Sequence, residues 1–141
     1  MPLDPHIESG LEVVEIPSTL QDAKGPEEAI LARVRECGYC EDAVFAIKLA
    51  LEEALTNAVK HGNCNDPTKR VIIRYYVGPD QTVILVRDQG CGFELKKVPD
   101  PTRPDRLGLP NGRGIMLMRA YLNEVFYQAG GREVCMIKRN E

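Results

Sequence analysis

The segment from Glu41 to His61 constrains the fold more strongly than any other part of this 141-residue chain. Its apolar residues recur at steps of three and four, which is the spacing of the buried stripe of an amphipathic helix. The stripe consists of Val44, Ile47, Leu51, Ala54, Leu55 and Ala58. Gly62 follows as the expected left-handed cap. We therefore predict one long helix with a firm stop and one buried face.

Strands and two shorter helices are predicted on either side of this helix. Runs rich in β-branched residues predict strands at 11–16, 70–77, 82–87, 123–128 and 132–138. Turn residues at 78–81 and 129–131 join the last four strands into two hairpins. The shorter helices are predicted at 26–37, with Pro26 in the first turn, and at 114–121. No repeat or linker divides the chain, so residues 1–141 are predicted to form a single domain.

Composition and charge exclude several classes of protein. An apolar fraction of 43% and a charged fraction of 28% are ordinary for soluble globular domains. The formal net charge of −3 argues against direct nucleic-acid binding, since neutralising phosphates requires clustered Lys and Arg. No apolar run approaches the ~20 residues that cross a bilayer, and the N-terminus lacks the pattern of a signal peptide. With five scattered cysteines, we expect a cytoplasmic protein that does not act at a membrane.

Three polar stretches are candidates for chemistry, and the first lies on the long helix. Glu53, Asn57 and His61 follow one another at four-residue steps, on a flank beside the apolar stripe. Carboxylate and amide oxygens are ligands that Mg²⁺ accepts alongside phosphates and water. Taken alone, the same pattern also describes the solvated flank of an amphipathic helix. For His61 we expect a favourable interaction with the helix dipole ahead of a catalytic role.

The second stretch contains Asp88, Gly90 and Gly92, directly after an apolar strand. A carboxylate at a strand end can accept a hydrogen bond from an exocyclic amine such as that of adenine. Glycines on either side let the backbone approach a flat ring, because no Cβ stands in the way. The alternative is an ordinary turn, where Asp and Gly are common.

The third stretch, Gly112, Arg113 and Gly114, follows Asn111 and opens the last predicted helix. Free backbone N–H groups at a helix start bind phosphate well, and glycines permit close approach. The guanidinium of Arg113 can add contacts to phosphate oxygens. A glycine-rich turn with an asparagine cap is again the alternative.

Together and in this order, the three stretches resemble the ATP-binding boxes of the histidine-kinase-like ATPases. The boxes span Glu53 to Gly62, Asp88 to Gly92 and Gly112 to Gly114, and the resemblance covers residues 45–138. It implies an α+β fold: a two-layer α/β sandwich in which helices cover one face of a mixed, mostly antiparallel sheet.

Within that superfamily, the chain is most similar to serine/threonine kinases that act as anti-sigma factors. The resemblance implies that Asn57 holds Mg²⁺ and that Glu53 is the general base acting on a partner's serine. It also implies that Asp88 accepts a hydrogen bond from the adenine amine of ATP, while Gly90 and Gly92 shape the pocket.

The resemblance further implies that Gly112 and Gly114 close around the phosphates, with residues 93–111 as a lid over ATP. Kinases of this kind phosphorylate a small anti-anti-sigma protein, their antagonist, and alternately hold a sigma factor. They are commonly homodimers, so the same partners and state are expected for this chain.

Two departures from the family pattern leave alternatives open. Pro110 stands where these kinases often have an arginine that touches the terminal phosphate, and Arg132 and Glu133 stand where a threonine is often found. The first alternative is a non-catalytic ATP-binding module that regulates a protein partner, for which nucleotide binds without phosphate transfer. The second is a domain that phosphorylates histidine in trans, for which the phosphate on the partner is acid-labile.

Overall fold

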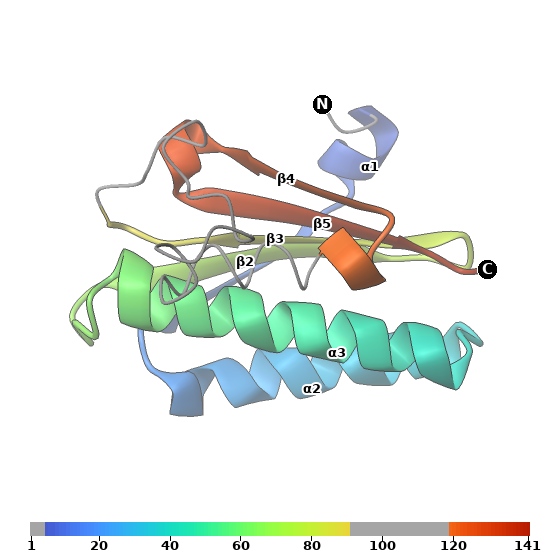
Figure 1. The fold of residues 1–141 in the computed structure, drawn as a ribbon, viewed down its shortest axis with the longest axis horizontal. Coiled ribbons are helices and arrows are strands. Elements are labelled where there is room, and N and C mark those ends of the chain that lie inside the picture. Colours follow the sequence, from blue (N-terminus) through green and yellow to red (C-terminus); the bar gives the residue numbers. More distant parts are fainter. Residues whose placement is uncertain (1–4, 91–118) are drawn as a thin grey trace, which may run out of the picture.

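The computed structural model describes residues 5–90 and 119–141 of the chain. Within them, two long helices lie side by side on one face of a five-stranded sheet (Figure 1). The helices are α1 (Pro5–Ser9), α2 (Leu20–Glu36) and α3 (Glu41–Thr56), which continues into a π-helical turn (Asn57–Gly62). The strands are β1 (Glu12–Pro17), β2 (Arg70–Val77), β3 (Gln81–Arg87), β4 (Glu124–Gln128) and β5 (Glu133–Arg139). Among these described elements, no helix is long and apolar enough to cross a membrane.

The strands lie in the order β1-β2-β3-β5-β4, and every neighbouring pair is antiparallel. Both predicted hairpins form, β2 with β3 and β4 with β5. The second hairpin places β5 beside β3, which leaves β4 at the edge of the sheet. The predicted α+β architecture, with the two long helices on one face of the sheet, is therefore confirmed. A mixed sheet was expected, whereas all strand pairs in the described residues are antiparallel.

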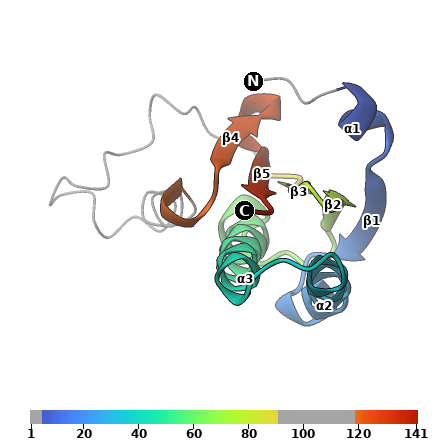
Figure 2. The same ribbon diagram turned by 90° about the vertical axis from the view of Figure 1, so that its right-hand side faces the viewer.

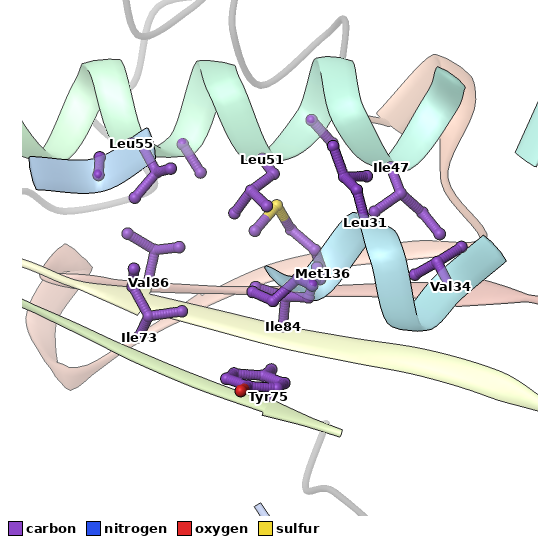
Figure 3. Close-up of a cluster of buried hydrophobic side chains, with 14 of the residues drawn as sticks. Leu31, Val34, Ile47, Leu51, Leu55, Ile73, Tyr75, Ile84, Val86 and Met136 are labelled. Atoms are coloured by element: carbon purple, nitrogen blue, oxygen red, sulfur yellow. The ribbon is translucent and has the colours of Figure 1, made fainter. Parts of the chain in front are cut away.

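The apolar stripe of α3 packs on the inner face of the sheet, as predicted. Leu51 and Leu55 are buried in one cluster with Ile73 of β2 and Val86 of β3 (Figure 3). The neighbouring helix α2 contributes Val34, which is also fully buried. Residues along β2 alternate between buried and half-buried, so one side of the strand faces the helices. Removing this apolar surface from water is the main favourable contribution to folding.

The opposite face of the sheet is partly covered by the short helix α1 (Figure 2). Ile7 of α1 is buried in a second cluster with Val83, Leu85 and Cys135. Helix α1 was not predicted from the sequence, because five residues are too few to show helical periodicity. This helix therefore depends on its tertiary contact with the sheet.

A buried carboxylate, Glu133, lies on the same face at the start of β5, with only 2% of its surface exposed. Nη2 of Arg74 donates hydrogen bonds to both of its carboxylate oxygens, at 3.0 and 3.1 Å. Nε2 of Gln128 donates a third, at 2.7 Å. These three bonds make the burial of the charge tolerable, since an unpaired carboxylate would be strongly destabilising there.

Helix α2 begins at Leu20, earlier than the predicted start at Pro26. Thr19 has an extended backbone, and its Oγ1 accepts a hydrogen bond from the Asp22 N–H at 3.0 Å. This N-cap satisfies one of the free donors at the helix start. Pro26 therefore lies inside the helix, where it has no N–H to donate to the carbonyl of Asp22. The prediction that Pro26 occupies the first turn is wrong, because the cap at Thr19 decides the start.

Two carboxyl groups, Glu27 of α2 and Glu52 of α3, face each other across the groove between the long helices. The pKa of Glu27 is raised from 4.5 to about 7, first by burial and then by its hydrogen bond with Glu52. The negative charges of Glu52 and Glu28 raise it further, while the positive charge of Lys48 lowers it. A hydrogen bond between two carboxyl groups requires a proton on one of them. The two helices therefore pack most favourably when the pair holds that proton.

Replacing Glu27 with glutamine should remove a pH dependence of stability. Because the folded state binds this proton more tightly than the unfolded state, its contribution is complete below about pH 4.5 and lost as the pH rises through about 7. Relative to wild type, Glu27→Gln should therefore gain free energy of unfolding as the pH rises across this window. Urea unfolding at several pH values measures the difference. Glu36→Gln, the same change at an exposed position of the same helix, is the control. A constant difference for Glu27→Gln would contradict the shared proton.

Candidate functional site

A pocket of about 190 Å³ opens where the last turns of the long helix meet the end of β3 and the start of β5. In Figure 1 this is the end of the molecule where α3, the end of β3 and the connection between β4 and β5 converge. The lining residues come from all of these elements. They are Ala54, Asn57, Ala58, His61, Gly62, Cys64, Lys69, Val86, Asp88, Tyr127, Gly131, Arg132 and Val134. The first two predicted motifs, separated in sequence, thus contribute to one cavity.

Asn57 enters the pocket at the point where the helix changes from α to π geometry. π-helical turns are rare and often accompany functional sites. The amide nitrogen of Asn57 is buried, and it has no hydrogen-bond partner within the described part of the chain. Leaving a buried donor unpaired costs free energy, so this group is suited to an acceptor supplied by a ligand. The amide oxygen on the same side chain is a hard ligand of the kind that Mg²⁺ prefers.

Gly62 and Gly90 allow the end of the helix to approach the segment around Asp88 closely. A Cβ at Gly62 would overlap the Asp88 carboxylate, and a Cβ at Gly90 would overlap the carbonyl oxygen of Gly62. Gly62 is not the predicted left-handed cap, because the backbone becomes left-handed only at Cys64 (φ 54°) and Asn65 (φ 59°). Glycine is required at position 62 by this lack of space. Gly90, expected to shape the pocket, lies against the carbonyl of Gly62 and is not a lining residue.

Asp88 is half-buried in the pocket, with its carboxylate oriented by its own backbone neighbours. The N–H of Gly90 donates to Asp88 Oδ1 at 2.8 Å. Burial raises the pKa of Asp88, while this hydrogen bond and the positive charges of Arg132 and Lys69 act in the opposite direction. A partly desolvated carboxylate with lone pairs still available is a suitable acceptor for a ligand's N–H donor.

Glu53 lies one turn before Asn57 and is half-buried, but it is not among the residues that line the pocket. Its negative charge contributes to raising the pKa of Tyr127, after the larger effect of burial. The positive charge of Arg119 lowers the same pKa. Glu53 is thus placed beside the pocket, on the side where Tyr127 enters from β4.

The remaining predicted residues lie outside the described residues. These are Gly92 of the second motif and the whole third motif, Gly112, Arg113 and Gly114. The predicted lid at 93–111 and Pro110 also fall there. Their roles in nucleotide binding stay predictions.

Several pocket residues were not identified from the sequence. Lys69 and Arg132 stand immediately before β2 and β5, where single cations have no distinctive pattern. Tyr127 lies in a strand that was predicted correctly, but its position in the pocket depends on the strand order. Cys64 lines the pocket because the chain turns left-handed there after the π turn. For Lys69 and Tyr127 the sequence signal was only their closeness to strand ends. Arg132 stood out only as a departure from the family's usual threonine.

Residues 16–138 match the family described as "Histidine kinase-like ATPase domain". This range contains all three motifs. A protein named Serine-protein kinase RsbW from Bacillus licheniformis is 37% identical over 109 residues, covering 72% of this chain and 68% of its own. The protein of the same name from Bacillus subtilis (strain 168) is 33% identical with the same coverage. The one from Listeria innocua is 27% identical over 133 residues, covering 85% of each chain.

The fold is also found in a crystal structure of the RsbU and RsbW domains of Rv1364c from Mycobacterium tuberculosis. The TM-score is 0.60 at 16% identity, with 93% of this chain covered. This chain spans 31% of the length of that larger chain, so the likeness concerns the fold of one part of it. The matching range and the identities confirm the resemblance seen in the motifs: the chain belongs to the histidine kinase-like ATPase family, and its relatives there are serine-protein kinases of the RsbW type.

Proposed function

We propose that this chain is an ATP- and Mg²⁺-dependent serine/threonine protein kinase of the anti-sigma, partner-switching type. Membership in an ATPase domain family implies ATP binding, and the relatives are named serine-protein kinases. The observation that carries the proposal is the shared pocket, in which Asn57 and Asp88 meet beside Glu53.

In this proposal Asp88 recognises the base. Its carboxylate accepts a hydrogen bond from the exocyclic amine of adenine. The apolar residues Ala54, Val86 and Val134 line the same pocket and would contact the faces of the ring. The nearby cations Lys69 and Arg132 favour the ionised form of Asp88, which is the form that only accepts hydrogen bonds.

Asn57 is proposed to hold the phosphate end of the nucleotide together with Mg²⁺. Its buried, unpaired amide nitrogen supports this role, because a phosphate oxygen would supply the missing acceptor. The amide oxygen would serve as the metal ligand. When bound, Mg²⁺ neutralises phosphate charge and so assists phosphoryl transfer. Gly112, Arg113 and Gly114 are proposed to complete the phosphate contacts.

Glu53 is proposed to be the general base. It would accept the proton of a partner's serine hydroxyl as that oxygen bonds to the γ-phosphorus and the bond to the ADP oxygen breaks. Its position one helical turn before Asn57 supports this role, because Asn57 is the residue proposed to hold the phosphates. Because phosphoryl transfer depends mainly on positioning, the main contribution of Glu53 would be to hold the serine hydroxyl in the correct place.

The proposed partners are a small anti-anti-sigma protein as the phosphate acceptor and a sigma factor held alternately. A homodimer acting in the cytoplasm, without direct contact to nucleic acid, completes the proposal. Four cysteines of the described residues, Cys37, Cys40, Cys64 and Cys135, are free thiols, which agrees with a reducing compartment.

One observation favours a second candidate, a non-catalytic ATP-binding module. Asp88 and Asn57 line the pocket, whereas Glu53 lies beside it, so the nucleotide site is assembled without the proposed base. In such a module ATP would set the affinity for a protein partner, and no phosphate would reach that partner.

Replacing Asp88 with asparagine should abolish or strongly weaken nucleotide binding. The change replaces a carboxylate oxygen with an amide and removes the negative charge that attracts the adenine amine. Calorimetric titration of ATP and ADP, with and without Mg²⁺, measures the effect. Wild type should bind with Mg²⁺ dependence and the variant should bind at least about tenfold more weakly, a loss of about 1.4 kcal/mol or more. Absence of binding by wild type would contradict the nucleotide site altogether.

Replacing Glu53 with glutamine should separate catalysis from binding. Loss of a general base typically slows transfer by about 10²–10⁴-fold, while ADP affinity should stay near that of wild type. The assay is transfer of labelled phosphate from ATP to an anti-anti-sigma protein, with acid-stable phosphoserine as the product. Glu52→Gln is the matched control, since it makes the same change one residue away on the side facing α2. Nucleotide binding with no transfer by wild type would favour the non-catalytic module.

Replacing Gly62 with alanine should weaken ATP binding through crowding. The added Cβ would overlap the Asp88 carboxylate and displace it from its place in the pocket. We expect at least about a tenfold rise in the dissociation constant, measured by the same titration. Gly25→Ala in α2 is the control, because its Cβ meets no atom within 4 Å. It should leave binding intact, because it lies far from the pocket residues; equal affinities for both variants would contradict the crowding.

A further inference from the structure

The residue directly after the π turn, Asn63, has 0% of its surface exposed and uses both donors and the oxygen of its side-chain amide. Its Nδ2 donates to Ser18 Oγ at 2.9 Å and to the carbonyl oxygen of Arg70 at 3.0 Å. Its Oδ1 accepts from the Gln89 N–H at 2.8 Å. Breaking any of these bonds would leave a buried polar atom unpaired. Asn63 therefore ties the end of the long helix to three other segments.

The bonds of Asn63 to Arg70 and Gln89 form a closed ring with a third bond, which joins Arg70 to the side chain of Gln89. Oε1 of Gln89 accepts from the Arg70 N–H at 2.7 Å, and the carbonyl of Arg70 accepts from Asn63. Asn63 in turn accepts from the backbone N–H of Gln89. The ring thus fixes the peptide group that joins Asp88 to Gln89. On the other side, the Asp88 N–H donates to the carbonyl of Arg132 at 2.9 Å.

The ring also sets the distance between Gly62 and Asp88. Gly62 precedes Asn63 in the chain, and Gln89 follows Asp88, so the bond from Gln89 to Asn63 draws the two neighbours together. The absence of a Cβ at Gly62 allows the Asp88 carboxylate to lie directly against it. The hydrogen bond from the Gln89 N–H to Asn63 and the missing side chain at Gly62 therefore both favour the close contact between Gly62 and Asp88.

We propose that Asn63 is the positioning residue of the adenine site, because it holds Asp88 against Gly62 and thereby orients the carboxylate toward the base. The inference rests on the proposed role of Asp88 as acceptor for the adenine amine. Asn63 is not one of the residues that line the pocket, so it acts through Asp88 and makes no contact with the nucleotide.

The decisive variant is Asn63→Leu, which keeps the branched shape of the side chain but removes all three hydrogen bonds. Its dissociation constant for ADP should rise about tenfold or more, as expected when a recognition group loses its position. The preference for ADP over GDP should also fall, because guanine presents a carbonyl where adenine presents the amine read by Asp88.

Ser18→Ala provides the matched control. It removes only the Ser18 bond and leaves the ring with Arg70 and Gln89 complete. Its melting temperature should fall, since Ser18 is buried, but its dissociation constant and base preference should equal those of wild type. A folded Asn63→Leu with wild-type affinity and preference would overturn the proposal. Equal losses of affinity in Asn63→Leu and Ser18→Ala would also overturn it, because affinity would then only follow stability.

A measurement on wild type tests the proposal even where a variant does not fold. The Gln89 amide should exchange with solvent slowly, although its side chain is exposed, because Asn63 Oδ1 accepts its hydrogen. Exchange as fast as in an open loop would overturn the proposal. If wild type binds no nucleotide but this amide is protected, the kinase proposal fails while the ring stands. If wild type binds ADP and the amide is unprotected, only the role of Asn63 fails.

Discussion

Burial of the apolar face of α3 against the sheet is the interaction on which the rest of the structure depends. Leu51 and Leu55 are inaccessible to solvent, and the helix cannot rotate without exposing this stripe. The flank that carries Glu53 and Asn57 is therefore fixed in direction, and the last turns of the helix point at the strand end occupied by Asp88. A hydrophobic interaction without chemical specificity thus places the polar groups of the site.

At the site itself, polar contacts and close backbone packing replace apolar burial. The helix widens into a π turn at Asn57, and the chain after it is held by the buried amide of Asn63. Gly62 and Gly90 remove the side chains that would keep the two segments apart. Such an arrangement tolerates little change, because hydrogen bonds in a low-dielectric interior are strong when made and costly when lost.

Much of the fold could be predicted because its signals are local. The stripe of α3, the alternation in β2 and the turns of both hairpins each appear within a few consecutive residues. The start of α2 was misplaced because Pro26 gave a stronger signal than the cap at Thr19. Gly62 was predicted to be a left-handed cap, whereas glycine is required there because a Cβ would overlap Asp88, which is distant in sequence. Asn63 carried no signal at all, since one asparagine after a helix is common.

The sequence by itself determined the long helix, the five strands, the family and the two motifs that meet in the pocket, because periodicity and motif order are properties of neighbouring residues. Only the tertiary structure decided the strand order that brings Tyr127 and Arg132 to Asp88, and the ring that links Asn63 to Gln89. It also decided that Glu133 is buried with Arg74. The physical reason is that a buried polar group is stable only with its partners, and those partners come from distant parts of the chain.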